Sequence, residues 1–380
     1  DYYGEYFLPI GGGGGGNDND ERNDGGVLFC SSVLHIRGAR LTPQPVLSSS
    51  SSSPGEAKNI LCYNGELFEQ CYDDVTNEDA SPASKNSIGN GSDTLWLFDL
   101  LNACRSLSQV SEIISQLEGP FALSFYHAAS HCLCYARDRF GRRSLLERIE
   151  SEENDGIDWA ITSVAFDDGR YEDVPVTGVH VRDLTEGITT TLPYPTVTIA
   201  REDGNDEDVV LVPPATIGTM GAIESTPIPA NELSSDPVIL HRAGQLHHLL
   251  SRAVRRRVHP STLPTPSPSS NIIPLGILFS GGLDSTVLAA LTHHHLPPRY
   301  PIELLTVCFD TPSNYQSPDR KAAARGYEEL TRLYPAREWK LVLVNVPYEQ
   351  VVAQGREVRG CLRPRETHMD FNVGSAFWFL

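Results

Sequence analysis

The segment Ser280-Gly281-Gly282-Leu283-Asp284-Ser285 constrains the fold of this chain more than any other, because of what flanks it. An apolar run over 275–279 predicts a short buried strand before it, and the apolar residues 286–291 predict the start of a helix after it. A glycine turn between strand and helix presents N–H groups at the positive end of the helix dipole and lets a phosphate approach the backbone closely. Ser280 and Ser285 add hydroxyl donors, and Asp284 could hold a divalent cation. The segment lacks the Lys-Ser/Thr ending of a Walker A loop. It therefore predicts a different phosphate-binding loop, with a simple glycine turn capped by Asp284 as the alternative.

The residues after this loop alternate between apolar runs and helical patterns. Residues 303–309 and 339–346 predict two further strands, with a helix over 321–334 between them. Strand–helix alternation of this kind predicts a parallel, doubly wound sheet whose ligand lies at the carboxyl ends of the strands. Ahead of the loop, apolar residues at helical spacing predict a helix over 238–258.

Two clusters of basic side chains stand at the ends of predicted helices. Arg252 and Arg255 to Arg257 lie at the end of the helix over 238–258, and His293 to His295 end the helix after the loop. Cations at a helix C-terminus complement the helix dipole. We interpret both clusters in this way, with a phosphate contact and a metal site as the respective alternatives.

The hexapeptide resembles the pyrophosphate loop of the ATP pyrophosphatases, which include asparagine, GMP and NAD synthetases. The resemblance implies that ATP binds with Mg²⁺ and is cleaved between its α and β phosphates, leaving an adenylate. It assigns ATP and pyrophosphate binding to Ser280, Gly281, Gly282, Leu283, Asp284 and Ser285, with Asp284 as the metal ligand. It also implies that Phe279, Val307 and Cys308 lie on the adenine side.

Four segments in the first half of the chain point to a second site. They are the strand and turn over 60–68 with Asn64-Gly65-Glu66, the helix start Ser92-Asp93-Thr94, the strand 119–125, and the motif Ala136-Arg137-Asp138-Arg139-Phe140-Gly141. In this order they resemble class II glutamine amidotransferases. The resemblance implies that Asn64, Gly65, Glu66 and Asp93 bind glutamine. Taken singly, the Asn-Gly pair is also typical of a hairpin turn, and Ser92-Asp93 of a helix cap.

Together the two halves resemble the asparagine synthetase family, and within it the divergent branch of asparagine synthetase domain-containing proteins. The segments typical of that branch are Leu34 to Gly38 before Gln44-Pro45, the run 140–146, and Ser375 to Phe379. The resemblance implies an α/β protein of two domains. These are an N-terminal α/β/β/α amidotransferase sandwich and a C-terminal doubly wound parallel sheet with a pyrophosphate loop.

Low-complexity stretches suggest where the domains begin and end. We expect an amidotransferase-like domain over 1–190, a linker rich in proline and acidic residues over 191–237, and an ATP-pyrophosphatase-like domain over 238–380. Polar, glycine-rich or serine-rich stretches predict disordered inserts at 11–24, 48–55 and 77–91. Within the linker, the apolar run 209–212 could pair as an edge strand.

Three departures from the family pattern concern the glutamine half. Class II amidotransferases use an N-terminal cysteine whose free amine activates its own thiol, whereas these residues begin with Asp1 and contain no cysteine before Cys30, in a predicted core strand. Leu34 stands where the family has an arginine for the glutamine carboxylate, with Arg37 displaced by a few residues, and 163–166 replaces a Ser-Glu-x-Lys pattern. We expect these residues to hold no catalytic residue and to show no glutaminase activity, and we expect the complete protein to bind glutamine weakly. We expect the nucleophile to lie in a segment before Asp1, and a second glycine- and acid-rich loop to lie after Leu380.

Composition restricts the partners. A net charge of −19 over 380 residues argues against nonspecific binding to nucleic acid or to an anionic membrane, and no apolar run of about 18 residues predicts a membrane span. The eight cysteines form no Cys-x-x-Cys pair, so we expect reduced, mostly buried thiols in a cytoplasmic protein. Cys132 and Cys134 alternate along one predicted strand and should face the same side.

These features predict an asparagine synthetase-like, glutamine-hydrolysing enzyme that amidates aspartate through an aspartyl-adenylate. Its substrates would be small molecules: glutamine or ammonia, aspartate and ATP. The complete loop beside a weakened glutamine half predicts that ammonia supports turnover at least as well as glutamine. Two alternatives stay open, a non-catalytic descendant that binds nucleotide and acts as an interaction partner, and an enzyme that amidates another acceptor. The residues also leave open the oligomeric state, including a homodimer.

Overall fold

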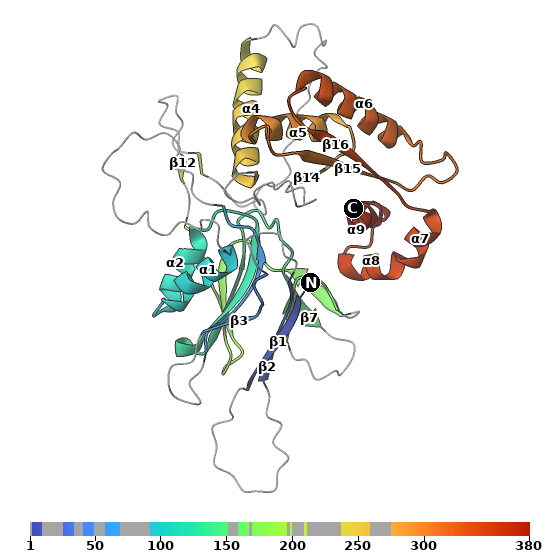
Figure 1. Ribbon diagram of the computed structural model, residues 1–380. Helices are drawn as coiled ribbons and strands as arrows, with labels where there is room; N and C mark the ends of the chain where they lie inside the picture. Colours follow the sequence, from blue (N-terminus) through green and yellow to red (C-terminus); the bar gives the residue numbers. More distant parts are fainter. Residues whose placement is uncertain are drawn as a thin grey trace, which may run out of the picture. The chain divides into compact units, whose positions relative to one another are not determined.

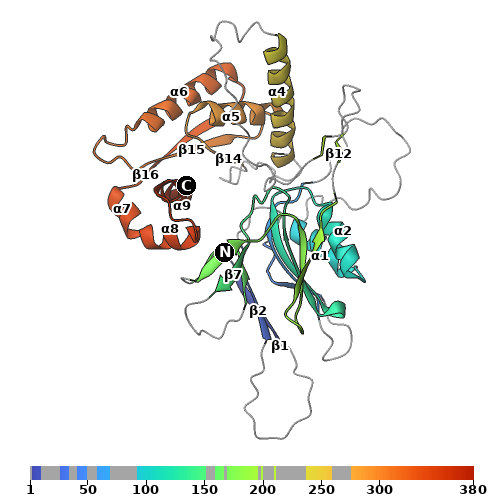
Figure 2. The ribbon, with the colours of Figure 1, turned by 180° about the vertical axis from the view of Figure 1, so that it is seen from behind.

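The computed structural model describes residues 2–9, 26–33, 41–48, 58–68, 92–150, 159–166, 169–195, 198–199, 209–210, 237–258 and 275–380. The chain forms two compact units, each described here by itself (Figures 1 and 2). Unit 1 comprises Asp1–Ser163 and Asp168–Gly221, and unit 2 comprises Val164–Asp167 and Ala222–Leu380. The predicted inserts, apart from Ser48, lie outside the described residues, as do Leu34, Arg37 and most of the predicted linker.

Unit 1 is built on a six-stranded antiparallel sheet with the order β11-β10-β6-β5-β4-β3. The strands are β3 Val46–Leu47, β4 Ile60–Gly65, β5 Phe121–His127, β6 Cys132–Arg137, β10 Gly178–Asp183 and β11 Thr189–Pro193. The short 3₁₀ helix η2, Ala128–Ser130, joins β5 to β6. All of β6 is buried, and all of β5 except Ser124, because both faces of the sheet are covered.

Helices cover one face of this sheet. They are α1, Asp93–Asn102, and α2, Leu107–Ser115. Alternate residues of β5, namely Phe121, Leu123 and Phe125, share one core cluster with apolar residues of both helices. Cys132 and Cys134 lie in the same cluster, which confirms the prediction that they face the same side.

Short strands cover the other face. The hairpin of β1, Tyr2–Pro9, and β2, Gly26–Val33, packs Leu8 and Phe29 against Tyr126. A three-stranded sheet of β7 Leu146–Glu150, β8 Ile161–Thr162 and β9 Arg170–Asp173 belongs to the same unit. Around it, Leu145 and Val174 pack on Tyr135. The helix–sheet–strand layering confirms the predicted α/β sandwich for three of its four layers, and a second outer helical layer is not among the described residues.

Unit 1 extends past the boundary predicted at residue 190. Strand β11 runs to Pro193 because Thr191 and Leu192 continue the ladder with β10. The Tyr194 hydroxyl then donates to the carbonyl of Arg137 at 2.7 Å, and the Arg139 guanidinium lies 4.8 Å from the centre of its ring. Farther on, β12 Thr198–Ile199 pairs with β13 Val209–Val210, so the first two residues of the 209–212 run do form a strand.

Unit 2 contains a parallel sheet with the order β14-β15-β16, which confirms the predicted strand–helix alternation. The elements are α4 Pro237–Arg257, β14 Gly276–Leu278, α5 Leu283–His295, β15 Ile302–Cys308, α6 Pro318–Leu333 and β16 Trp339–Asn345. Ile302 and Leu304 share a core cluster with Ala289 of α5 and Leu330 of α6. Both crossover helices therefore cover the same face of these three strands.

Three short helices follow β16 in the same unit: α7 Tyr348–Ala353, α8 Gly355–Leu362 and α9 His368–Phe379 (Figure 1). The ring of Phe379 meets that of Phe309, the residue after β15, with centroids 6.0 Å apart. Helix α9 therefore reaches the carboxyl end of the sheet, where parallel sheets bind ligands. No helix in the described part of the chain has the length and hydropathy needed to cross a membrane.

The cysteines differ in part from the expectation of mostly buried thiols. All seven described cysteines are free, but Cys30 and Cys361 are exposed, and Cys62 and Cys104 are half-buried. Cys30 lies on β2 as predicted, yet its neighbour Phe29 turns inward and Cys30 outward because strand side chains alternate. Burial raises the pKa of Cys134 to about 12, so this thiol stays protonated and inert.

Candidate functional site

The predicted glutamine-binding turn begins at the end of β4. Asn64 pairs with Ala122 in the β4–β5 ladder, and the Glu66 amide donates to the Pro120 carbonyl at 2.9 Å. A side chain at Gly65 would place its Cβ 2.4 Å from that same carbonyl oxygen. Glycine is required at this position because the turn lies directly against the segment that leads into β5.

The Asp93 carboxylate joins the two sides of this turn. One oxygen accepts from the Tyr63 hydroxyl and from the Leu67 amide, both at 3.1 Å, and the other accepts from the Thr94 amide at 2.9 Å. Asp93 is only 7% exposed, and the adjacent Ser92, not Asp93, caps α1. The structure thus brings Asp93 together with the Asn64–Glu66 turn, and both oxygens of the carboxylate already have protein donors.

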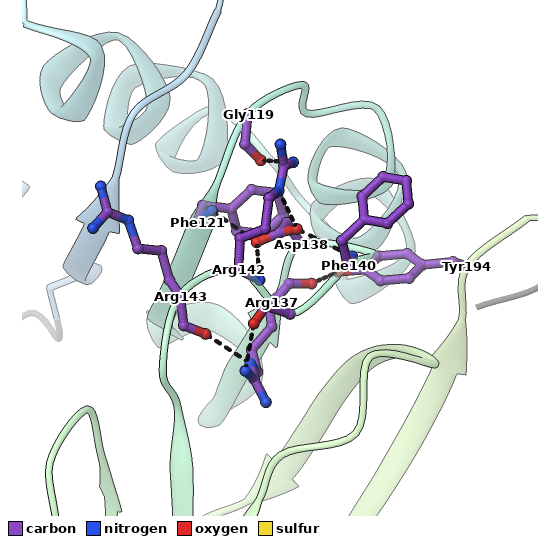
Figure 3. Close-up of polar contacts among 9 residues, drawn as sticks. Gly119, Phe121, Arg137, Asp138, Phe140, Arg142, Arg143 and Tyr194 are labelled. Atoms are coloured by element: carbon purple, nitrogen blue, oxygen red, sulfur yellow. Dashed lines mark hydrogen bonds and ion pairs between the residues drawn. The ribbon is translucent and has the colours of Figure 1, made fainter. Parts of the chain in front are cut away.

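Asp138 organises the loop behind the turn (Figure 3). Its two oxygens accept from the amides of Phe121, Phe140 and Arg142 at 3.0–3.1 Å and from Arg142 Nε at 2.9 Å. A second nitrogen of Arg142 donates to the Gly119 carbonyl at 2.8 Å, beside the Pro120 carbonyl that holds Glu66. The motif from Ala136 to Gly141 therefore fixes the 119–121 segment. Because this segment is hydrogen-bonded to Glu66, the motif also supports the predicted glutamine-binding turn.

Two residues near the turn, Tyr63 and Arg143, were not predicted as site residues from the sequence. Tyr63 is 8% exposed, and burial, followed by the charge of Asp93, raises its pKa well above the ordinary value, so its hydroxyl stays a donor. Its backbone pairs with the buried Gln44 side chain through bonds of 2.6 and 3.0 Å. Arg143 acts electrostatically on Tyr63, and its buried Nε has no hydrogen-bond partner among the described residues. In Figure 3 the Arg143 side chain points away from the Asp138 cluster. The only signal in the sequence was the pair of arginines after Gly141.

The described cysteines offer no activated thiol at this turn. Cys62, the cysteine nearest to it along the chain, packs with the β1–β2 side of the sheet, whereas Tyr63 packs on the helical side. Burial raises the pKa of Cys62, which keeps the thiol protonated.

In unit 2, the predicted pyrophosphate loop lies flush against α6. Gly281 has φ +74°, and an added Cβ would lie 2.2 Å from the backbone of Ala322 and Ala323. Both the left-handed conformation and the close backbone contact require glycine. The loop enters from Phe279, whose amide donates to the Leu305 carbonyl of β15 at 2.7 Å, so β15 fixes the starting point of the loop.

The polar groups of the loop bond mainly to one another. Ser280 Oγ accepts from the Gly282 amide and lies 3.3 Å from Ser285 Oγ, which donates to the Gly282 carbonyl at 3.1 Å. Gly282 caps α5 without a side-chain hydrogen bond, and Leu283 is 79% exposed beside the exposed Asp284. The start of α5 therefore faces open space with its amides uncapped, as an anion site requires.

The three residues predicted for the adenine side do not share a face. Phe279 and Cys308 are buried at 2% and 3% exposure in or beside the helix-covered core, whereas Val307 points to the other face of β15. Burial, the largest influence, raises the pKa of Cys308. Hydrogen bonds from Ser317 and the Asp310 amide, with the charge of Arg320, outweigh it and lower that pKa overall. Only Val307 keeps a partly exposed side chain for an apolar contact.

Arg320, at the start of α6, was also missed. It is 5% exposed and donates to Asn345 Oδ1 at 2.9 Å and to the Val344 and Thr306 carbonyls at 2.8 and 3.3 Å. The guanidinium ties the carboxyl ends of β15 and β16 together beside Cys308. Its signal was an arginine in the first turn of a helix, where a cation opposes the dipole and needs a specific reason.

The candidate metal ligand stands by itself. Among the described residues, no three His, Cys, Asp or Glu side chains gather into a group that could hold a metal ion. Asp284 would thus share a magnesium ion with the phosphates of a bound nucleotide. The histidines at the other end of α5 are packed in the structure: the His293 ring stacks on Tyr334 at 4.1 Å, and its Nδ1 accepts from Arg337.

Comparison with known proteins bears on both units. Residues 34–155 match the family model of a glutamine amidotransferase domain, and residues 245–332 match that of asparagine synthase. These matches confirm the resemblance seen in the sequence.

Three curated relatives align with more than nine tenths of the chain. The chain is 28% identical to the human and to the mouse asparagine synthetase domain-containing protein 1, over 93% of its length. It is 26% identical, over 92% of its length, to an asparagine synthetase domain-containing protein of Saccharomyces cerevisiae. The chain spans 65%, 66% and 57% of the length of these relatives, respectively.

Among solved structures, glutamine phosphoribosylpyrophosphate amidotransferase from B. subtilis is 13% identical to this chain. The alignment covers 86% of this chain and 77% of the amidotransferase chain. The TM-score is 0.31, a similarity too low to bear on the fold or the function.

Proposed function

We propose that this chain carries the nucleotide half and the glutamine half of an asparagine synthetase-like enzyme, which uses ATP and Mg²⁺ to amidate aspartate. The observation that supports this most is the loop Ser280–Ser285, with its uncapped helix start, paired hydroxyls and exposed carboxylate. We place the reaction in the cytoplasm, where the free thiols of the described cysteines would stay reduced.

In the proposed reaction, a carboxylate oxygen of aspartate attacks the α-phosphorus of ATP, and pyrophosphate leaves. Ammonia then attacks the acyl carbon, the bond to AMP breaks with its electron pair, and the nitrogen loses a proton to give the amide. The amides at the start of α5 and the hydroxyls of Ser280 and Ser285 would hold the leaving pyrophosphate. Asp284 would hold Mg²⁺, which neutralises charge on the phosphates.

The glutamine half would contribute binding through the Asn64–Glu66 turn and Asp93. Arg143 is our candidate for the glutamine carboxylate, because its buried Nε lacks a partner among the described residues and it acts on Tyr63. Asp93 would have to share its oxygens between glutamine and its three present donors. For this reason we expect weak glutamine binding, and ammonia-dependent turnover at least as fast as glutamine-dependent turnover.

A nucleotide-binding protein without catalysis is the second candidate. The three protein donors to the Asp93 carboxylate favour it, because the glutamine-side motif then needs no ligand to account for its buried acid. An enzyme that amidates a different acceptor is the third, since the described residues hold no assigned contact to aspartate.

Pyrophosphate release separates the three. The chain would be assayed with ATP, magnesium and either aspartate or other carboxylates, with ammonia or glutamine as the nitrogen source. We expect aspartate-dependent release that ammonia supports, and loss of that release in Asp284→Ala. Release with another carboxylate alone would support the third candidate. Saturable ATP binding by calorimetry without release from any carboxylate would support the second, and the absence of ATP binding would refute all three.

A further inference from the structure

Helices α7, α8 and α9 enclose a pocket that the proposed reaction does not use. Its volume is about 700 Å³, and it is lined by Tyr348, Val351, Val352, Gly355, Arg356, Arg359, Gly360, Arg363 and Phe371. This size is typical of a site for a small molecule. None of the residues of the pyrophosphate loop lines it.

The charge of the pocket has one sign. Arg356 and Arg359 project from one side of α8, because residues three apart share a helix face, and Arg363 follows directly after the helix and lines the same pocket. No lining residue is acidic, and the nearby carboxylate of Asp370 already accepts from the Thr367 hydroxyl at 2.5 Å. Neither Arg356 nor Arg359 has a carboxylate partner in the described part of the chain.

The pocket is also built to hold one of these arginines still. The Arg359 guanidinium carbon lies 4.1 Å from the centre of the Phe371 ring, and that ring packs beside Gly355. Stacking fixes the plane of a guanidinium and leaves its N–H edge free for bidentate contacts. At Gly360 an added Cβ would meet nothing within 4 Å, so the space in front of the arginines is open.

We propose that this pocket binds a small molecule with at least two anionic groups, through the guanidiniums of Arg356 and Arg359, with Arg363 as a third contact. Guanidinium forks match carboxylate and phosphate groups equally well, so the shared chemistry is a compact polyanion. The exposed side chains of Tyr348 and Val352 would receive its carbon body. This site is separate from the ATP loop and stands whether or not the proposed reaction occurs.

The test is a calorimetric titration of the chain, without magnesium, with two probes. Pyrophosphate represents phosphate ligands and citrate represents carboxylate ligands. We expect saturable binding of at least one probe, with affinity at least tenfold lower in the Arg356→Gln/Arg359→Gln variant and in Gly360→Leu. The preferred probe identifies which of the two chemistries the ligand carries.

Matched controls isolate the pocket. Arg325→Gln/Arg332→Gln removes the same charge from exposed positions of α6, and Gly244→Leu adds the same side chain at a helical glycine of α4 that also has open space. Both should bind the probe like the wild type, and circular dichroism should show all variants folded. Unchanged affinity in the arginine and Gly360 variants would overturn the proposal. So would loss of binding in Ser280→Ala/Ser285→Ala instead, since the probe would then sit in the loop. Binding of hexaglutamate peptide but of neither probe would overturn it in favour of a peptide ligand.

Discussion

The two predicted sites differ in what their polar groups contact. In unit 1, the Asp93 carboxylate is buried and accepts three protein hydrogen bonds, and the Asp138 carboxylate, 2% exposed, accepts four. In unit 2, Leu283 and Asp284 of the predicted pyrophosphate loop are exposed, and the loop hydroxyls bond only within the loop. The glutamine side is closed on itself, and the nucleotide side is open.

This difference decides how much each motif says about function. A buried carboxylate needs donors whether or not a ligand exists, so the fold alone accounts for Asp93 and Asp138. The exposed carboxylate of Asp284 complements the dipole of α5, but no requirement of the fold accounts for an exposed leucine beside it at an uncapped helix start. Of the loop residues, only Gly281 has a clear structural reason, its contact with α6. The open loop therefore supports nucleotide binding more strongly than the closed turn supports glutamine binding.

The sharpest way to break this comparison is to remove Asp93. In Asp93→Ala, the Tyr63 hydroxyl and the Leu67 and Thr94 amides lose their acceptor inside the protein, and we expect the free energy of unfolding of unit 1 to fall by about 3 to 5 kcal/mol. Urea unfolding, with hydrogen exchange of the 60–68 segment to assign the effect to unit 1, measures it. Asp93→Asn, which keeps one acceptor oxygen, should lose about half as much. A change below about 1 kcal/mol in Asp93→Ala would mean that the carboxylate serves a ligand and not the fold.

Alanine substitution of two neighbouring glycines tests the structural role of Gly281 in the open loop. Gly281→Ala combines a left-handed φ with a Cβ 2.2 Å from the backbone of α6, and we expect a loss of about 2 to 4 kcal/mol in unit 2. Gly282→Ala is the control, because its Cβ would meet only Ser280 Oγ, at 3.4 Å. Equal losses in both variants, measured by urea unfolding, would show that the loop does not rest on α6.

The sequence predicted the architecture of unit 2 well because its signals are local. Apolar runs such as 303–309 and helical spacing over 238–258 place strands and helices within a few residues of where they lie. The burial of side chains on these elements was predicted less well than the positions of the elements. Leu240, Leu246 and Leu249 keep the helical spacing of α4 but are 54–61% exposed, because periodicity identifies a helix and not what covers it.

The candidate sites were less predictable because they depend on contacts between distant residues. Arg142 supports the glutamine-side turn through a carbonyl 23 residues away, and Tyr63 meets Asp93 across 30 residues. The assignment of Phe279, Val307 and Cys308 to the adenine side stays a prediction, and the period-two alternation of 302–308 places the side chains of Val307 and Cys308 on opposite faces of β15. The predicted boundary at 190 falls before the end of β11, because Thr189 to Pro193 lacks the apolar alternation of a buried strand and is mostly exposed at the sheet edge.

The open loop should tolerate substitutions that the closed site does not. Asp284→Ala and Leu283→Ser should change the free energy of unfolding by no more than about 0.5 kcal/mol, because both side chains are exposed. In contrast, Asp284→Ala should weaken magnesium-dependent ATP binding at least tenfold, or about 1.4 kcal/mol. Thermal unfolding with and without ATP and magnesium reports both effects at once. A large loss of stability without ligand would place Asp284 in the same class as Asp93.

Unit 2 also contains a closed region, at the opposite end of α5 from the loop, and its pH dependence is the smallest effect we predict. Arg337, 3% exposed, donates to the carbonyls of His293, Leu296, Pro297 and Tyr300 and to His293 Nδ1. Burial, then the charges of Arg337 and His294, lower the pKa of His293 from its ordinary value of 6.5. The unfolded chain therefore takes up a proton at a pH where folded His293 is still neutral, so the stability is present above pH 6.5 and is lost as the pH falls through the folded pKa.

Urea unfolding of unit 2 at several pH values between 7.5 and 5 checks this in wild type and in His293→Gln. We expect the wild type to lose more stability on acidification than the variant, because glutamine cannot take up the proton. His293→Gln should keep part of the pH dependence of the wild type, since burial and the charges of Arg255 and His294 also lower the pKa of His295. His241→Gln, at an exposed position of α4, is the matched control and should keep the slope of the wild type. Identical slopes of unfolding free energy against pH in wild type and His293→Gln would mean that solvent reaches the region around Arg337. Both ends of α5 would then be open to solvent.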